Sequence, residues 1–146
     1  MGSYVERNLG AGEQLVYQTG IHPIVYLGPA VLILGGIGFG LIYSPAGGVA
    51  LLGLGVLTLI AAYIRQRAAE FAVTSKRVIV KLGFVSRRTI EINMSKVESV
   101  EVNQGIFARL FNYGTIVVIG TGGTKEPFDL INDPLAFRRA VQSQQG

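Results

Sequence analysis

The chain has 146 residues, a formal net charge of +4, no Cys, no Trp and a single His. Only 15% of its residues are charged, well below the usual quarter, and residues 14–64 contain no Asp, Glu, Lys or Arg, which excludes an ordinary soluble domain. A content of 49% hydrophobic residues excludes a disordered chain, and the lack of Cys excludes disulfides, thiol nucleophiles and Cys-based metal sites.

The uncharged stretch divides into two apolar segments, residues 24–43 and 46–64. A helix rises about 1.5 Å per residue, so each segment is long enough to cross a hydrocarbon core of about 30 Å. Ser44 and Pro45 separate the segments, and two glycines follow closely, which is typical of a turn. We therefore expect a transmembrane helical hairpin at residues 23–64. One continuous helix is the alternative, and Pro45 argues against it.

The charges on either side of the apolar segments predict their orientation. Arg65 and Arg67 follow the second segment directly, whereas the turn between the segments carries no charge. Positive charge favours the cytoplasmic side, and two spans bring both termini to that side. We expect residues 1–22 to form a cytoplasmic N-terminal arm, in which residues 14–19 are a candidate strand.

Residues 65–146 are predicted to form a cytoplasmic domain. In residues 77–83 and 87–93, apolar and polar side chains alternate with a period of two, which is typical of half-buried antiparallel strands. Asp133 is a good N-cap and Pro134 suits the first position of a C-terminal helix. The fold class is therefore α+β, with six or seven strands capped by one helix. The further strand candidates are residues 70–74, 97–104, 115–120 and 126–131.

Three stretches of this region carry a family resemblance: FAVTSKRVIVKLGFVSRRTIEI at residues 71–92, SKVESVEVNQG at residues 95–105 and LFNYGTIVV at residues 110–118. Together with Asp133-Pro134, they resemble the second class of bacterial pleckstrin-homology (PH) domains, found in small membrane proteins of the YdbS-like kind. The resemblance covers residues 71–141, about half of the chain. It implies a strongly bent antiparallel sheet or barrel closed by a C-terminal helix, an adjoining hydrophobic hairpin and no enzymatic activity.

No set of catalytic side chains can be assembled from the sequence. His22 is the only imidazole, and it precedes Pro23 at the expected membrane boundary. Glu91, Glu98 and Glu101 lie on strand patterns among polar residues, which is typical of charge balance on an exposed sheet face. The ligand spacings of metal sites are absent. We expect a non-catalytic protein without a metal or another cofactor.

Small residues on the two apolar segments indicate close helix packing. Gly36 and Gly40 have the spacing that lets helix backbones approach, and Ala46 and Ala50 repeat it on the second segment. Packing inside the hairpin and packing between subunits both fit this pattern. Because there are more small faces than one hairpin needs, we expect a homo-oligomer.

The most informative polar feature is a basic run at residues 65–88, whose seven cations and one acid give a net charge of +6. Contact with anionic lipid head groups is one interpretation, and a solvated rim that only sets topology is the other. Nucleic-acid binding is disfavoured because no basic–aromatic stacking pattern accompanies the charges. The candidate lipid-contact residues are Arg65, Arg67, Lys76, Arg77, Arg87 and Arg88.

Two short apolar inserts lie between predicted strands. The first contains Phe84 and Val85, and the second contains Phe107 and Phe111. For the first insert, covering the end of the core is favoured over insertion in the membrane interface or contact with a neighbour. These four side chains are the candidates for a partner or interface contact.

Taken together, the residues predict a non-catalytic interaction or scaffold protein at the cytoplasmic face of the bacterial inner membrane. Its expected partners are membrane lipid, further copies of itself and a membrane protein that the sequence does not identify. A small pore or transport-accessory subunit built from Gly-rich hairpins is the alternative. It is disfavoured because Ser44 and Thr58 are the only polar residues to line a pore.

Overall fold

The structure is a computed structural model that describes residues 4–83 and 86–145. It divides into two compact units. One unit spans Pro23–Arg67 and is called the hairpin below. The other combines the residues up to His22 with those from Ala68 onward, and is called the β domain.

The hairpin consists of a short 3₁₀ turn, η1 (Pro23–Tyr26), and two helices, α2 (Leu27–Ile42) and α3 (Pro45–Ala68). The expected break between the helices is confirmed. The Ser44 hydroxyl accepts a hydrogen bond from the Gly47 N–H at 3.3 Å and caps α3, whose first residue is Pro45. Helix α3 runs through Ala68, past the predicted end at residue 64, because Arg65, Gln66 and Arg67 are good helix formers.

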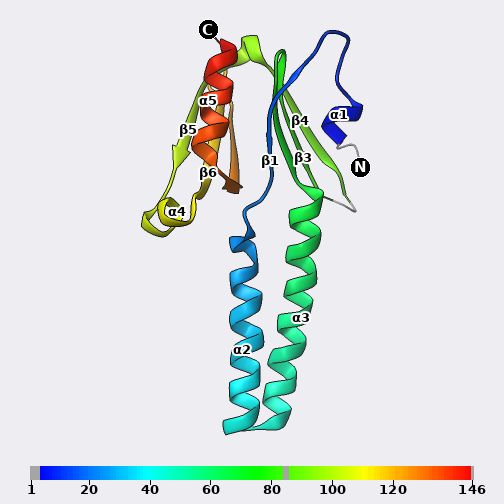
Figure 1. Ribbon diagram of the computed structural model, residues 1–146, viewed down its shortest axis with the longest axis vertical. Coiled ribbons are helices and arrows are strands. Elements are labelled where there is room, and N and C mark those ends of the chain that lie inside the picture. Colours follow the sequence, from blue (N-terminus) through cyan, green and yellow to red (C-terminus); the bar gives the residue numbers. More distant parts are fainter. Residues whose placement is uncertain (1–3, 84–85, 146) are drawn as a thin grey trace. The chain divides into compact units, whose positions relative to one another are not determined.

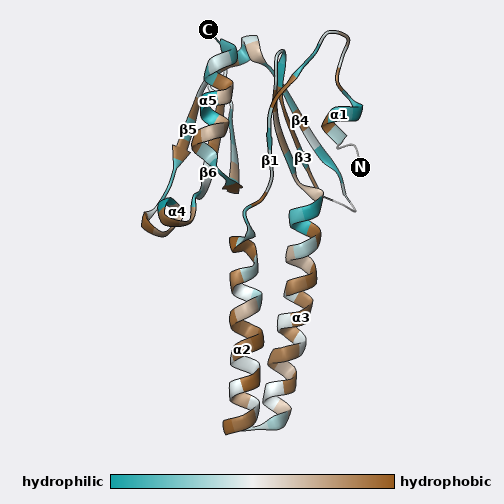
Figure 2. Ribbon diagram, in the orientation of Figure 1, coloured by the Kyte–Doolittle hydropathy of each residue, from teal (hydrophilic) through white to brown (hydrophobic). Residues whose placement is uncertain are grey.

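Both helices of the hairpin are long and apolar enough to cross a membrane. The candidate spans are Pro23–Ile42, with 20 residues, and Pro45–Ala68, with 24 residues. Apolar residues are spread along both helices, and polar residues gather at the end of α3 that leads into the next strand (Figure 2). Within the most apolar stretch of each span, only 11% and 17% of the residues are buried. These helices are therefore not core helices of the usual soluble kind, which hide their apolar residues.

In the part of the chain that the structure describes, the β domain contains seven strands in two antiparallel sheets (Figure 1). The first sheet has the order β1-β2-β3-β4, and the second has the order β5-β6-β7. In chain order the strands are β1 (Leu15–Thr19), β2 (Glu70–Thr74), β3 (Arg77–Leu82), β4 (Arg88–Asn93), β5 (Val97–Asn103), β6 (Tyr113–Gly120) and β7 (Lys125–Asn132).

The α+β class and the strand candidates are confirmed, including the strand expected at residues 14–19. The expectation of a single bent sheet is replaced by two sheets, because the 3₁₀ turn η2 (Met94–Lys96) separates β4 from β5. An isolated bridge between Ile21 and Ile131 joins the segment after β1 to β7.

The described residues of the β domain also form the helices α1 (Tyr4–Arg7), α4 (Ile106–Phe111) and α5 (Pro134–Gln145). The expected cap of α5 is present, since Asp133 Oδ1 accepts a hydrogen bond from the Ala136 N–H at 3.3 Å. Helix α5 packs on β1, β2, β5 and β6, and its Phe137 and Val141 are fully buried. Phe71 from β2 and Ile116 from β6 are buried as well, so α5 closes a core shared by both sheets.

Candidate functional site

The chain passes between the β domain and the hairpin at one end of the domain. β1 runs toward His22, the last residue of the domain before Pro23, and its residue Thr19 pairs with Phe71 near the start of β2. We call this the hairpin-linked end. The turn at Ser75–Lys76, between β2 and β3, lies at the far end, because the five residues of β2 extend about 16 Å at about 3.3 Å per residue.

This register separates the basic residues that the sequence grouped together. Arg88 pairs with Leu82 and lies with Arg87 at the hairpin-linked end, whereas Lys76 and Arg77 lie at the far end. These four lipid-contact candidates therefore do not lie together at one end of the sheet. The reason is that β3 runs back antiparallel to β2, so that neighbours in sequence are carried to opposite ends of the sheet.

Arg87 and Arg88 are exposed, and Arg88 Nη2 lies 3.5 Å from Glu126 Oε2. Arg65 and Arg67 are also exposed, in the last turns of α3, where the Arg67 guanidinium lies over the Tyr63 ring at 5.4 Å. All four keep side-chain surface free for anionic groups.

Arg77 is instead committed to contacts inside the β domain. Its Nε and Nη2 donate to the two carboxylate oxygens of Glu13, at 2.9 and 3.0 Å, and its Nη1 donates to Glu91 at 2.7 Å. Nη2 also donates to the Asn8 carbonyl at 2.7 Å. Arg77 thus makes four hydrogen bonds inside the β domain, which gives it a structural role there.

Glu13 is the other half of this ion pair and is buried. Burial by itself would raise its pKa, but hydrogen bonds from Arg77, from the Thr74 hydroxyl and from the Gly10 N–H outweigh burial and lower the pKa from 4.5 to about 2. This pair could not be identified from the sequence. No local pattern marks it, because Glu13 and Arg77 are 64 residues apart.

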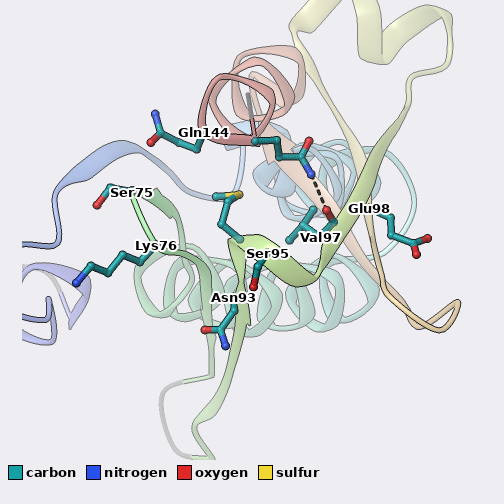
Figure 3. A pocket seen from close by; sticks show the side chains of 9 residues that line it. Ser75, Lys76, Asn93, Ser95, Val97, Glu98 and Gln144 are labelled. Carbon is teal, nitrogen blue, oxygen red and sulfur yellow. Dashed lines mark hydrogen bonds between the residues drawn. The ribbon is translucent and has the colours of Figure 1, made fainter.

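A polar pocket of about 670 Å³ lies at the far end of the β domain (Figure 3). Figure 3 shows the Lys76 and Glu98 side chains pointing away from each other, and Lys76 Nζ donates to the Ala11 carbonyl at 3.0 Å. Gln145 Nε2 donates to the Val97 carbonyl across the pocket at 2.6 Å. The pocket therefore offers amides and hydroxyls but no concentrated charge. Its lining residues are Ser75, Lys76, Asn93, Met94, Ser95, Val97, Glu98, Gln144 and Gln145.

The described residues do not assemble a metal site. Within residues 4–83 and 86–145, no three His, Asp or Glu side chains lie close enough together to hold a metal ion. Figure 3 also shows no pair of carboxylates facing each other in the polar pocket.

The small residues of the hairpin fall into two groups. A Cβ on Gly36 would lie 2.9 Å from the Leu52 nitrogen, and one on Gly48 would lie 2.8 Å from the Gly36 carbonyl and collide with the Gly40 Cα. Gly36 and Gly40 thus pack against Gly48 inside the hairpin. Ala46 and Ala50 are exposed and do not take part in this contact.

The two apolar inserts also differ. Phe84 and Val85 lie outside the described residues. Phe107 and Phe111 lie on α4, between β5 and β6, and both are exposed together with Ile106 and Leu110.

The sequence was compared with models of known protein families. The family model described as "Bacterial PH domain" matches residues 25–145, which include both helices of the hairpin as well as β2 to β7. No curated protein matches this sequence.

One solved structure has a similar fold. It is the crystal structure of a DUF1696 family protein with a pleckstrin-homology domain from Shewanella loihica, with a TM-score of 0.53 and 10% sequence identity. The alignment covers 97% of this chain and 90% of the other, and at this identity the likeness establishes the fold alone. Together with the two antiparallel sheets and the closing helix α5, the family match shows that this chain belongs to the bacterial PH-domain family.

Proposed function

We propose that this protein is a membrane-anchored, non-catalytic interaction module. In this proposal the hairpin crosses the bacterial inner membrane, both termini and the β domain are cytoplasmic, and copies of the chain assemble with one another. Arg87 and Arg88 contact anionic lipid head groups. The family match supports the coarser part of this statement, a PH-like interaction module, since such modules bind and do not catalyse.

The observation that carries the proposal is the pairing of β1 with β2. β1 precedes the apolar hairpin and β2 follows it, yet Gln18 pairs with Ala72 and Thr19 with Phe71 in one sheet. The hairpin therefore starts and ends at the same folded domain, as two membrane crossings require. The exposure of its apolar side chains supports the same conclusion, because they would otherwise meet water.

Charge supports the cytoplasmic placement of the β domain. Arg65 and Arg67 end α3, and no charge lies in the turn at Tyr43–Ser44 between the helices. Arg87 and Arg88, at the hairpin-linked end, add two exposed cations. Each cation near an anionic leaflet is worth about 1 kcal/mol, so this end favours the cytoplasmic surface.

Self-assembly is supported by surfaces of the hairpin that are not buried in the contact between α2 and α3. Ala46 and Ala50 are exposed on α3, and a shallow apolar groove of about 280 Å³ runs beside Gly36, Gly40 and Gly48. Small side chains allow the close helix approach that drives association in lipid. A helix of a second copy fits such a surface.

A pore is less well supported. The Thr58 hydroxyl donates to the carbonyls of Leu54 and Gly55 in its own helix, at 3.0 and 2.9 Å, and the Ser44 hydroxyl caps α3. These hydroxyls already have partners and are not arranged as the lining of a water-filled path.

Cysteine labelling tests the proposal directly, because the natural chain has no Cys. In intact cells, a membrane-impermeant maleimide is expected to label Pro45→Cys, in the turn of the hairpin, and to label Ser143→Cys only after permeabilisation. The reverse pattern would contradict the orientation, and protection of both sites would contradict a crossing at the turn. Ion flux through liposomes containing the purified protein would favour the pore instead.

A further inference from the structure

Helix α4 exposes a compact cluster of large apolar side chains. Ile106, Phe107, Leu110 and Phe111 are 86%, 71%, 74% and 51% exposed. They are four of the six residues of the helix, and Ala108 is its buried residue. Soluble surfaces rarely gather apolar side chains in this way unless the patch meets a partner or a membrane.

The four side chains share one face of α4. At about 100° per residue, Ile106, Leu110, Phe107 and Phe111 span an arc of about 140°, flanked by Arg109 on one side and Ala108 on the other. Ala108 faces the β domain, so the apolar arc and the exposed Arg109 are turned outward. The large apolar side chains of α4 thus point away from the β domain, whereas a surface helix usually turns its large apolar side chains toward the core.

The β domain holds α4 firmly in this position. Asn112 ends the helix in the left-handed conformation, with φ at 61°, and Gln104 Nε2 donates to the Tyr113 carbonyl at 2.9 Å across the base of the insert. The Asn112 carbonyl accepts a hydrogen bond from the Asp133 N–H at 3.0 Å. The exposed face is therefore fixed by hydrogen bonds at the base of the insert and at the helix C-terminus.

The helix also lies at the hairpin-linked end. The Tyr113 ring, two residues beyond α4, packs against His22 with ring centroids 5.3 Å apart. His22 donates its N–H to the Leu130 carbonyl at 2.7 Å, and the next residue, Pro23, begins the first apolar span. Chain continuity thus places α4 near the residue at which the first candidate span begins.

We propose that α4 is an interfacial anchor, which inserts Ile106, Phe107, Leu110 and Phe111 into the boundary between head groups and acyl chains. This inference rests on the proposed function, because it requires the hairpin to span the bilayer. Arg109 would lie at the edge of the inserted face and meet anionic head groups. The surface of the bilayer is favoured over a second copy of the chain because His22, whose ring packs against Tyr113 just beyond α4, is followed directly by the first span.

The test uses full-length, single-Cys variants labelled with an environment-sensitive fluorophore and reconstituted into vesicles of phosphatidylcholine and phosphatidylglycerol. In one preparation a fraction of the lipid carries a nitroxide near the top of the acyl chain, and in a second preparation the nitroxide lies near the end of the acyl chain. Each nitroxide quenches by contact, so the first reports on the interface and the second on the middle of the bilayer. Leu110→Cys reports on α4, and Leu57→Cys, on an exposed position of α3, reports on the hairpin. Thr121→Cys, in the turn between β6 and β7 at the far end, is the matched control on the β domain.

An interfacial helix lies about 5–10 Å deep, so the label at Leu110→Cys is expected to lose emission by about twofold or more with nitroxide lipid. The label at Thr121→Cys should be unaffected. Quenching at Leu57→Cys without quenching at Leu110→Cys would overturn the α4 anchor and leave the membrane-spanning hairpin intact. Absence of quenching at both would overturn the proposed function as well. A shift to shorter wavelength at Leu110→Cys without nitroxide quenching would assign the face to a second copy and overturn the anchor.

Discussion

Arg77 donates hydrogen bonds from Nε and Nη2 to the two carboxylate oxygens of Glu13, at 2.9 and 3.0 Å, although the whole hairpin lies between the two residues in the sequence. Glu13 belongs to the segment before β1, and Arg77 begins β3. Together with the hydrogen bond from Thr74 to Glu13, the pair ties the N-terminal segment to the β2–β3 turn. A fold whose N-terminal segment is separated from the rest by two apolar helices needs such a contact to hold that segment in place.

Removing the positive charge of Arg77 is expected to destabilise the β domain strongly. In Arg77→Met, Glu13 would stay buried without its charged partner, which costs about 3–5 kcal/mol in comparable pairs. The matched control is Arg88→Met, whose exposed pair with Glu126 should be worth less than about 1 kcal/mol. Urea unfolding of the full-length protein in detergent, followed by circular dichroism, measures both. Equal effects of the two variants would contradict the structural role of Arg77.

The same pair predicts how stability depends on pH. Because the pKa of Glu13 falls from 4.5 to about 2 in the folded state, the unfolded state binds more protons between these values. The stabilisation by ionised Glu13 is therefore present above about pH 4.5 and is lost as the pH falls toward 2. Glu13→Gln should be less stable at neutral pH and should lose less stability across this range. Parallel pH profiles for the two proteins would contradict the lowered pKa.

The hairpin should tolerate a large residue at one glycine and not at another. In Gly48→Leu, the new side chain would strike the Gly40 Cα and the Gly36 carbonyl, whereas around Gly53 nothing lies within 4 Å of a Cβ. Spin labels at Leu41→Cys and Val49→Cys, which line the groove beside Gly48, should move apart in Gly48→Leu. The same labels should keep their distance in Gly53→Leu, and a change there would contradict the packing described.

Self-association is expected to depend on residues outside this contact. Gly36→Leu would disturb the hairpin itself, so the cleaner variant is Ala46→Leu combined with Ala50→Leu, where both positions are exposed. We expect the natural protein to be larger than a monomer in mild detergent and the double variant to be smaller, because bulky residues obstruct close helix approach. Light scattering of the purified protein measures its molar mass in detergent. A natural protein that is monomeric would contradict the hypothesis of self-association.

Lipid contact should depend on which end of the sheet carries the cation. Arg87→Gln combined with Arg88→Gln, at the hairpin-linked end, should weaken the association of anionic lipid by about 2 kcal/mol, at about 1 kcal/mol per cation. Lys76→Gln, at the far end, should have no effect. The measurement is the fraction of spin-labelled phosphatidylglycerol that associates with the reconstituted protein. The difference in lipid association between the natural protein and the double variant should become smaller as the salt concentration rises. A larger effect from Lys76→Gln would contradict the assignment.

The elements whose signals are local could be predicted from the amino-acid sequence. The charge-free run and Pro45 were sufficient to predict two apolar helices and the break between them, since length and lack of charge decide whether a helix can cross a bilayer. Alternation in residues 77–93 predicted β3 and β4, and Asp133-Pro134 predicted the start of α5. Each of these features depends on residues within a few positions of one another.

Features that depend on strand register and on contacts between distant segments could be seen only in the folded chain. The antiparallel return of β3 sends Lys76 and Arg77 to one end of the sheet and Arg88 to the other, although they look like one basic run. Gly48, and not Ala46 or Ala50, became the partner of Gly36, because helix rotation selects which small residue faces inward. The Glu13–Arg77 pair likewise appears only when β1 is placed beside β2. The physical reason is the same in these three cases. A local sequence pattern indicates the type of structure that a residue favours, but the long-range pairing of strands and helices determines which residues become its neighbours.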